Sequence, residues 1–131
     1  RTQLLEHLLR DFDLEDVATQ RSETLSGGQR RRLEIARTMA SRPKVVLLDE
    51  PFAGVDPISI ESLQSAIRRV RDSGVAVLIT DHNVRDTLEL VDRAALIDRG
   101  TVLIEGTPSE ITADETARNR YFGDKFHYER R

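Results

Sequence analysis

The chain has no cysteine and no tryptophan, and aromatic residues make up only 5% of its 131 residues. Without cysteine it can form neither a disulfide framework nor a thiolate metal site. No apolar run approaches the roughly 18 to 20 residues that a membrane-spanning helix needs, and no secretory signal peptide is visible. We therefore expect no direct membrane insertion, so that any role at a membrane would come through a partner.

Charge of neither sign dominates the composition. Charged residues make up 33% of the chain and the formal net charge is −3, so no nucleic-acid partner is indicated. The only local basic run is Arg30 to Arg32, whose simplest interpretation is a solvated helix face. A length of 131 residues fits one domain or less.

Hydrophobic spacing and turn residues predict an α/β order of elements. In the first part we expect helices over residues 1–12, 28–41 and 57–73, strands over 45–49 and 75–80, and a polar loop over 13–24. Two strands joined by a helix pair in parallel. The continuous apolar runs in both strands, 45–48 and 75–79, are typical of strands that need cover on both faces.

The remaining third of the chain predicts a hairpin between short helices. Asp98-Arg99-Gly100 separates two apolar runs, which is a hairpin signal. The expected elements are a helix over 83–90, strands over 94–97 and 101–104, a short helix opening at 108–111 and another over about 114–122.

The segment Leu25-Ser26-Gly27-Gly28-Gln29 has the features of a helix start. Ser26 is a good N-cap, and Gln29 stands at capping-box spacing from it. The two glycines carry no side chain that would block a ligand's approach to the backbone. A helix start followed by arginines offers free N–H groups to an anion, although by itself the segment fits a capped surface helix equally well.

Polar residues also follow each predicted strand. Asp49 and Glu50 end the first strand and His82 follows the second, so these side chains should share the edge where α/β sheets bind ligands. With two carboxylates, one can neutralise the charge of a metal ion while the other accepts or orients a proton. Asp56-Pro57 reads as the N-cap and first residue of the next helix. The simpler alternatives are an acidic turn before Pro51 and a structural histidine.

In this order the motifs resemble the ABC-type ATPases: the LSGGQ signature at 25–29, a Walker B strand ending in Asp49 and Glu50, a D-loop at 53–56 and a switch histidine at 82. The resemblance implies that Asp49 joins the Mg²⁺ shell, that Glu50 polarises the attacking water and that His82 senses the γ-phosphate of ATP. It also implies that the signature binds the nucleotide of a second copy and that Asp56 lies where the D-loop crosses to that copy. The residues implied in nucleotide binding are Leu25, Ser26, Gly27, Gly28, Gln29 and Asp56.

The family's phosphate loop, G-x-x-x-x-G-K-[ST], does not occur in these 131 residues. We therefore expect the C-terminal half of a P-loop NTPase domain of the ABC type, with a mostly parallel sheet, flanking helices and a C-terminal hairpin. Residues 1–27 would end a helical subdomain and hold the signature loop, and 28–131 would be the C-terminal part of the ATPase core. ATP and Mg²⁺ would then belong to the intact domain, and this chain alone would be inactive.

Three stretches narrow the resemblance to the ATPase subunits of bacterial lipopolysaccharide exporters. They are Asp49 to Ser59, Leu78 to Arg85, and Tyr121-Phe122-Gly123-Asp124 with Phe126. That subgroup implies an ATP hydrolase that works as a dimer with transmembrane permease subunits, peripheral on the cytoplasmic face of the inner membrane.

Other classes stay open beside this one. Branched-chain amino acid importer ATPases share the turn at 106–108 and an aromatic-x-Gly tail. A non-transport ABC ATPase would show long heptads before the signature, where only 24 residues without heptad register stand. A binding module that has lost hydrolysis is a further alternative. Because both strands are apolar on both faces, we also expect the chain on its own to form a homo-oligomer.

Overall fold

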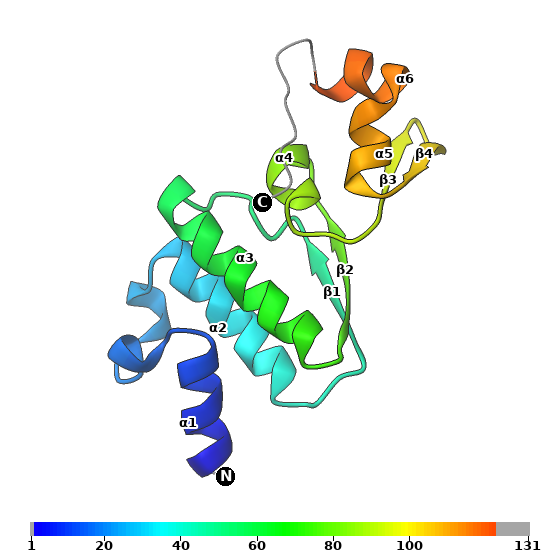
Figure 1. Cartoon of the computed structure of the whole chain (residues 1–131). Coiled ribbons are helices and arrows are strands. Elements are labelled where there is room, and N and C mark those ends of the chain that lie inside the picture. The colour runs from blue at the N-terminus through cyan, green and yellow to red at the C-terminus, as the bar shows by residue number, and fades with distance from the viewer. Residues whose placement is uncertain (1, 123–131) are drawn as a thin grey trace. The chain divides into compact units, whose positions relative to one another are not determined.

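The computed structural model describes residues 2–122, and it consists of two compact units (Figure 1). The first unit ends at His82 and the second begins at Asn83. Each unit has its own small sheet and its own helices. None of the helices over 2–122 is long and apolar enough to cross a bilayer.

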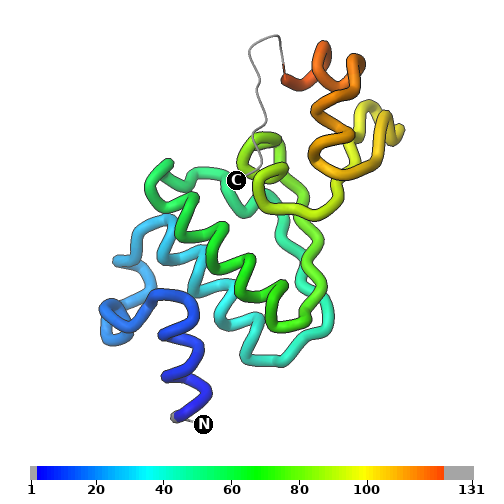
Figure 2. Tube along the Cα trace, in the orientation of Figure 1, coloured from blue at the N-terminus to red at the C-terminus, as the bar shows by residue number. Residues whose placement is uncertain are grey.

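The first unit is built around a strand–helix–strand crossover. Its elements are α1 (Thr2–Asp11), two short 3₁₀ turns η1 (Glu15–Val17) and η2 (Ser22–Thr24), α2 (Gly27–Met39), β1 (Val45–Asp49), α3 (Pro57–Asp72) and β2 (Ala76–Thr80). The strands β1 and β2 pair in parallel, from Val45 opposite Ala76 to Asp49 opposite Thr80. The trace in Figure 2 follows the chain from β1 through α3 back to β2. The predicted parallel unit is confirmed.

Local signals explain why α3 begins and ends where it does. Asp56 caps its first turn, with the Ser59 N–H donating to Asp56 Oδ1 at 3.0 Å, and Pro57 occupies the first helical position. Gly74, with φ of +88°, ends the segment in the left-handed region that glycine adopts without strain. The buried stripe of the helix follows helical spacing: Leu63, Ala66, Ile67 and Val70. Helix α2 lies alongside α3 (Figure 1).

Only one face of the β1–β2 sheet is buried. Val46 is 2% exposed, whereas Val45 is 56% exposed and Leu47 71%. On β2, Leu78 is 59% exposed and stands directly opposite Leu47 in the register. The strands are therefore apolar on both faces, as the sequence indicates. Within residues 2–122, however, other elements cover only one of these faces.

The predicted loop over residues 13–24 differs from the structure in two ways. It contains the turns η1 and η2, and Leu14 at its start is 2% exposed. Phe12, just before it, is equally buried at 3%. Turns of three residues have no periodic pattern that would reveal them in a sequence, so a segment that looked polar nevertheless contributes to the core.

The basic run at the start of α2 is not a uniformly solvated face. Arg31 does lie toward solvent, paired with Glu34 at 3.0 Å. Arg32 is buried instead: its Nε donates to the Phe12 carbonyl oxygen at 3.0 Å and its NH1 to Ser62 Oγ at 2.9 Å. The guanidinium thus joins the end of α1 to α3 through α2, and the interpretation of Arg32 as a surface residue is wrong.

The second unit contains the predicted hairpin between short helices. Its elements are α4 (Val84–Leu88), β3 (Ala94–Asp98), β4 (Thr101–Gly106), α5 (Pro108–Ala113), α6 (Glu115–Ala117) and a final π turn η3 (Arg118–Phe122). Arg99 and Gly100 both have positive φ, +48° and +79°, as a two-residue hairpin turn of the I′ kind requires. Leu96, Ile111 and Ala117 form its core. The tail residues at 123–126 in the exporter resemblance lie outside the described residues.

The start of α5 gives a testable pH dependence. Thr107 and Glu110 form a capping box, in which the Thr107 N–H donates to Glu110 Oε2 at 2.7 Å. This hydrogen bond, followed by that from the Thr107 hydroxyl, lowers the pKa of Glu110. Because the folded pKa is depressed, the stabilisation is complete above the ordinary glutamate value of about 4.3 and is lost as pH falls through the folded value.

We expect Glu110→Gln to flatten the acid side of the stability profile. Glutamine keeps the capping-box geometry but does not titrate in this range. In urea unfolding followed by circular dichroism between pH 3 and 7, the wild type should lose unfolding free energy faster than the variant as the pH falls. Parallel profiles for the two proteins would show that the capping carboxylate does not contribute.

Candidate functional site

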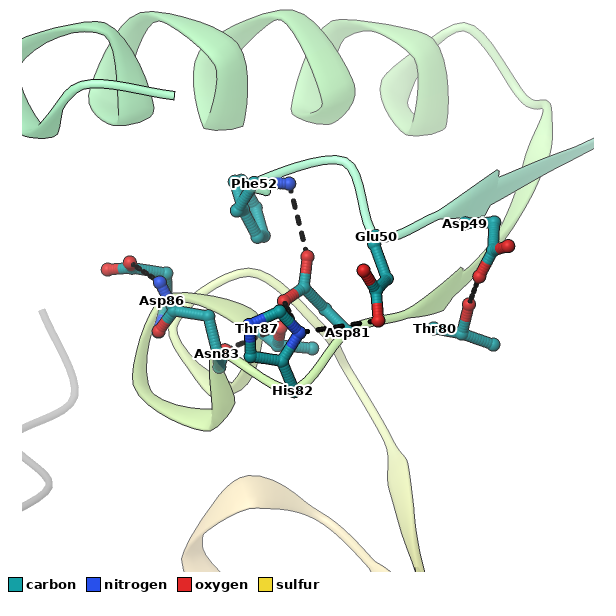
Figure 3. A network of polar contacts seen from close by, with 9 residues as sticks. All are labelled: Asp49, Glu50, Phe52, Thr80, Asp81, His82, Asn83, Asp86 and Thr87. Carbon is teal, nitrogen blue, oxygen red and sulfur yellow. Dashed lines mark hydrogen bonds and ion pairs between the residues drawn. The ribbon is translucent and has the colours of Figure 1, made fainter. Parts of the chain in front are cut away.

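The carboxyl ends of β1 and β2 bring the polar side chains of two loops together. Asp49 ends β1 and stands opposite Thr80 at the end of β2, and the Thr80 hydroxyl donates to Asp49 Oδ1 (Figure 3). The edge predicted to carry the site is therefore formed as expected. The sequence predicts no role for Thr80, and only the register of the two strands reveals that it faces Asp49.

Glu50 and His82, the two residues predicted to be catalytic, lie in contact. His82 Nδ1 is 3.3 Å from Glu50 Oε1 (Figure 3). Both side chains are exposed, at 74% for His82 and 54% for Glu50, so their mutual attraction is strongly screened by water. The backbone of the two loops, rather than the pair itself, must hold the two groups at this distance.

Glu50 has an uncommon backbone conformation. Its φ is +45°, in the left-handed region that non-glycine residues seldom occupy. Its N–H still donates to the Thr80 carbonyl oxygen at 2.7 Å, which continues the strand ladder by one residue before the chain turns away. Such strain is concentrated at functional sites, where surrounding structure maintains it. The turn directs the Glu50 carboxylate toward His82.

The signature segment forms the cap that its sequence predicts. Ser26 is the N-cap of α2: the Gln29 N–H donates to Ser26 Oγ at 3.2 Å, and the Ser26 N–H donates to Gln29 Oε1 at 2.9 Å. Leu25, just before the cap, is buried. The polar side chains of Ser26 and Gln29 are thus engaged with the helix start in this structure.

The two signature glycines have a packing role that their sequence does not reveal. A Cβ atom at Gly28 would lie 2.5 Å from Ser59 Cβ, which is closer than any side-chain contact allows. A Cβ atom at Gly27 would lie 3.3 Å from the carbonyl oxygen of Gly54. Glycine therefore lets the start of α2 approach both the start of α3 and the predicted D-loop. The lack of a side chain at Gly28, which the sequence relates to the approach of a ligand, is thus also needed for packing against Ser59.

We expect Gly28→Ala to destabilise the chain by about 1–3 kcal/mol, the usual cost of overpacking. Ser59→Gly removes the atoms that would clash, so the double variant should recover part of the loss. Gly27→Ala is the milder comparison and should cost less, because its new methyl group would lie 3.3 Å from a single backbone oxygen, that of Gly54. Chemical unfolding of the wild type, Gly28→Ala, Ser59→Gly and the double variant measures the coupling between positions 28 and 59, and additive effects would contradict the packing role.

Asp56 is placed by the structure as a helix cap. Its side chain accepts hydrogen bonds from Ser59, and these bonds lower its pKa. The cap confirms the structural part of the prediction. The role of Asp56 in reaching a second subunit stays a prediction.

The metal assigned to Asp49 can be tested against the residues present. Asp49 is exposed, and one of its oxygens already accepts from Thr80. No group of three or more His, Cys, Asp or Glu side chains among residues 2–122 could hold a metal by itself. Mg²⁺ usually takes one or two carboxylates and fills its shell with water and phosphate oxygens. One exposed carboxylate therefore fits a Mg²⁺ ion that arrives with a nucleotide.

Relatives of known description share this sequence along nearly its whole length. The family profile described as ABC transporter matches residues 1–53. A probable ABC transporter ATP-binding protein of Azorhizobium caulinodans is 52% identical over 96% of the chain and 45% of the relative. The lipopolysaccharide export system ATP-binding protein LptB of Escherichia coli is 50% identical over 91% of the chain and 49% of the relative. The chain thus spans about half the length of these curated relatives.

Solved structures agree with the sequence relatives. An ATP-binding cassette of an ABC transporter in its ADP conformation matches with a TM-score of 0.80 and 25% identity, over 93% of this chain and 51% of that one. The cbiO1 protein of Clostridium perfringens, part of the ABC transporter complex cbiONQ, matches with the same TM-score and identity over 90% and 47%. By sequence, by fold and by the order of its motifs, the chain belongs to the ATP-binding domains of ABC transporters.

Proposed function

We propose that the chain is part of an ATP-hydrolysing transporter subunit that couples ATP binding and hydrolysis to the export of lipopolysaccharide from the inner membrane. The observation that carries the hydrolytic part is the 3.3 Å contact between Glu50 and His82 at the carboxyl ends of two paired parallel strands. The 50% identity to LptB, over 91% of this chain, supports the assignment to lipopolysaccharide export.

The chemistry follows from the position of each group. The Glu50 carboxylate is exposed and can accept a proton from, or orient, a water molecule that attacks a γ-phosphate. His82 faces Glu50 through Nδ1, which leaves Nε2 for a phosphate oxygen. Asp49 would hold Mg²⁺, which neutralises charge on the phosphate oxygens of a bound nucleotide. Glu50 and His82 thus divide water activation and phosphate contact between them.

The signature segment suits a nucleotide held by another subunit. The start of α2 combines an N-cap with two glycines, and such helix starts favour anions. A second copy of the subunit, bound head to tail, would supply the phosphate loop that faces this helix start. Transmembrane permease subunits would convert closure and opening of that dimer into transport, with the ATPase on the cytoplasmic face of the inner membrane.

The test uses the complete subunit that carries this chain. Produced in Escherichia coli depleted of its own LptB, it should restore lipopolysaccharide at the cell surface. ATP hydrolysis by the purified subunit without any such restoration would contradict the export assignment. The 131-residue chain is the negative control. Because it has no phosphate loop, its calorimetric titration with MgATP should be flat. Micromolar binding of ATP to it would contradict the assignment of ATP binding to the intact domain.

A further inference from the structure

The turn that follows Glu50 leaves one backbone donor to be satisfied from outside. Glu50 itself donates to the Thr80 carbonyl oxygen, and Pro51 has no N–H. The Ala53 N–H closes the turn by donating to the Glu50 carbonyl oxygen at 3.1 Å. Phe52 is 4% exposed, so its N–H lies where water is scarce and an unpaired donor would be costly.

The side chain of Asp81 supplies the missing acceptor. Asp81 Oδ2 accepts from the Phe52 N–H at 3.1 Å, and the Asp81 side chain is 0% exposed (Figure 3). A carboxylate with no exposed surface is retained only where it is hydrogen-bonded. Asp81 precedes His82 directly, so this one bond joins the loop after β2 to the turn after β1.

We infer that Asp81 is a positioning residue: its bond to Phe52 fixes the loop that carries Glu50 against the loop that carries His82. Two features of the site require a bond that holds the two loops together. The exposed Glu50–His82 pair is too well solvated to hold itself together. Glu50 is also in a left-handed conformation, which persists only when the surrounding structure imposes it.

We assign this role to the hydrogen bond of Asp81 with Phe52 rather than to the charge of Asp81. Asp81 Oδ1 also lies 3.9 Å from His82 Nδ1, which is within the range of an ion pair but beyond hydrogen-bonding distance. The contact of Asp81 that reaches the loop of Glu50 is the 3.1 Å hydrogen bond from the Phe52 N–H. Asparagine in place of Asp81 keeps an oxygen for the Phe52 N–H. Leucine is similar in shape and has no acceptor. Comparing the two variants therefore separates the effect of the hydrogen bond to Phe52 from the effect of filling the same space.

The first test uses the 131-residue chain and does not depend on ATP hydrolysis. Replacing Glu50 with Gln should shift the ¹⁵N resonances of the His82 ring. We expect this shift to shrink by at least half in Asp81→Leu and to be restored in Asp81→Asn. A full-sized shift in Asp81→Leu would overturn the inference. Should Asp81→Leu fail to fold, the wild type still decides: scalar coupling between the Phe52 amide and the Asp81 carboxyl carbon must be observable, and its absence also overturns the inference.

The second test rests on the proposed function and uses the complete subunit. Displacement of reacting groups by about 1 Å costs up to about 100-fold in rate, so Asp81→Leu should lower kcat by about 10- to 100-fold with the KM for ATP unchanged. Asp81→Asn should rescue most of the lost turnover. Unchanged kcat in Asp81→Leu overturns the inference, whereas a wild-type subunit that hydrolyses no ATP contradicts the proposed function and leaves the spectroscopic result valid.

Discussion

Glu50→Gln in the complete subunit is expected to lower ATP turnover by about 100-fold or more, while ATP binding and ATP-driven dimer closure persist. Glutamine is nearly the same size as glutamate and can keep the same backbone position, but it is a far weaker base. Positioned acid–base groups contribute about 10² to 10⁴ in rate, which sets the size of the loss. His82→Ala should also lower turnover without abolishing nucleotide binding.

Phosphate release measures the turnover, and size-exclusion chromatography with and without ATP measures the closure. Glu61→Gln is the matched control, because Glu61 is an exposed glutamate on α3. Its turnover should equal that of the wild type. Full turnover in the Glu50→Gln variant would show that the role of Glu50 has been misassigned.

The purified 131-residue chain is expected to self-associate at low micromolar concentration. Leu47 and Leu78 stand side by side on the exposed face of the β1–β2 sheet. Each such side chain gains about 1.5–3 kcal/mol when fully buried, and several together rival the whole stability of a small domain, about 5–15 kcal/mol. A second copy of the chain is the partner available in the purified sample.

Lysine substitutions test which surface is responsible. Leu47→Lys or Leu78→Lys should shift the light-scattering mass toward the monomer. Ile58→Lys is the control, because Ile58 is an apolar residue on α3 that is 90% exposed and lies outside the sheet. A folded wild-type monomer at the same concentration would contradict the prediction. An oligomer that the Leu47 and Leu78 variants leave intact would mean that another surface is used.

Features that depend on neighbouring residues could be predicted from the sequence. The capping box of Ser26 and Gln29, the Asp56-Pro57 helix start and the hairpin turn at Arg99-Gly100 all form as their short-range chemistry indicates. The sequence also predicts that Glu50 and His82 lie at the same edge of the sheet, because parallel strands bring their carboxyl ends together there.

Features that depend on packing between distant segments could not be predicted in this way. Thr80 faces Asp49 only because of the strand register, and Gly28 is required only because α3 places Ser59 against it. The sequence predicts no role for Asp81, because its partner is the backbone N–H of Phe52, 29 residues earlier in the chain. The left-handed φ of Glu50 likewise has no signal in its residue type.

The buried guanidinium of Arg32 has a consequence for how this sequence can change during evolution. In the run Arg30-Arg31-Arg32 the three residues look interchangeable. Only Arg32 donates through two arms of its fork to oxygens of two other segments, which a lysine ammonium cannot reproduce. Across homologous chains, positions 30 and 31 should drift freely among Arg, Lys and Gln. Position 32 should keep arginine, or change only together with the residue at 62.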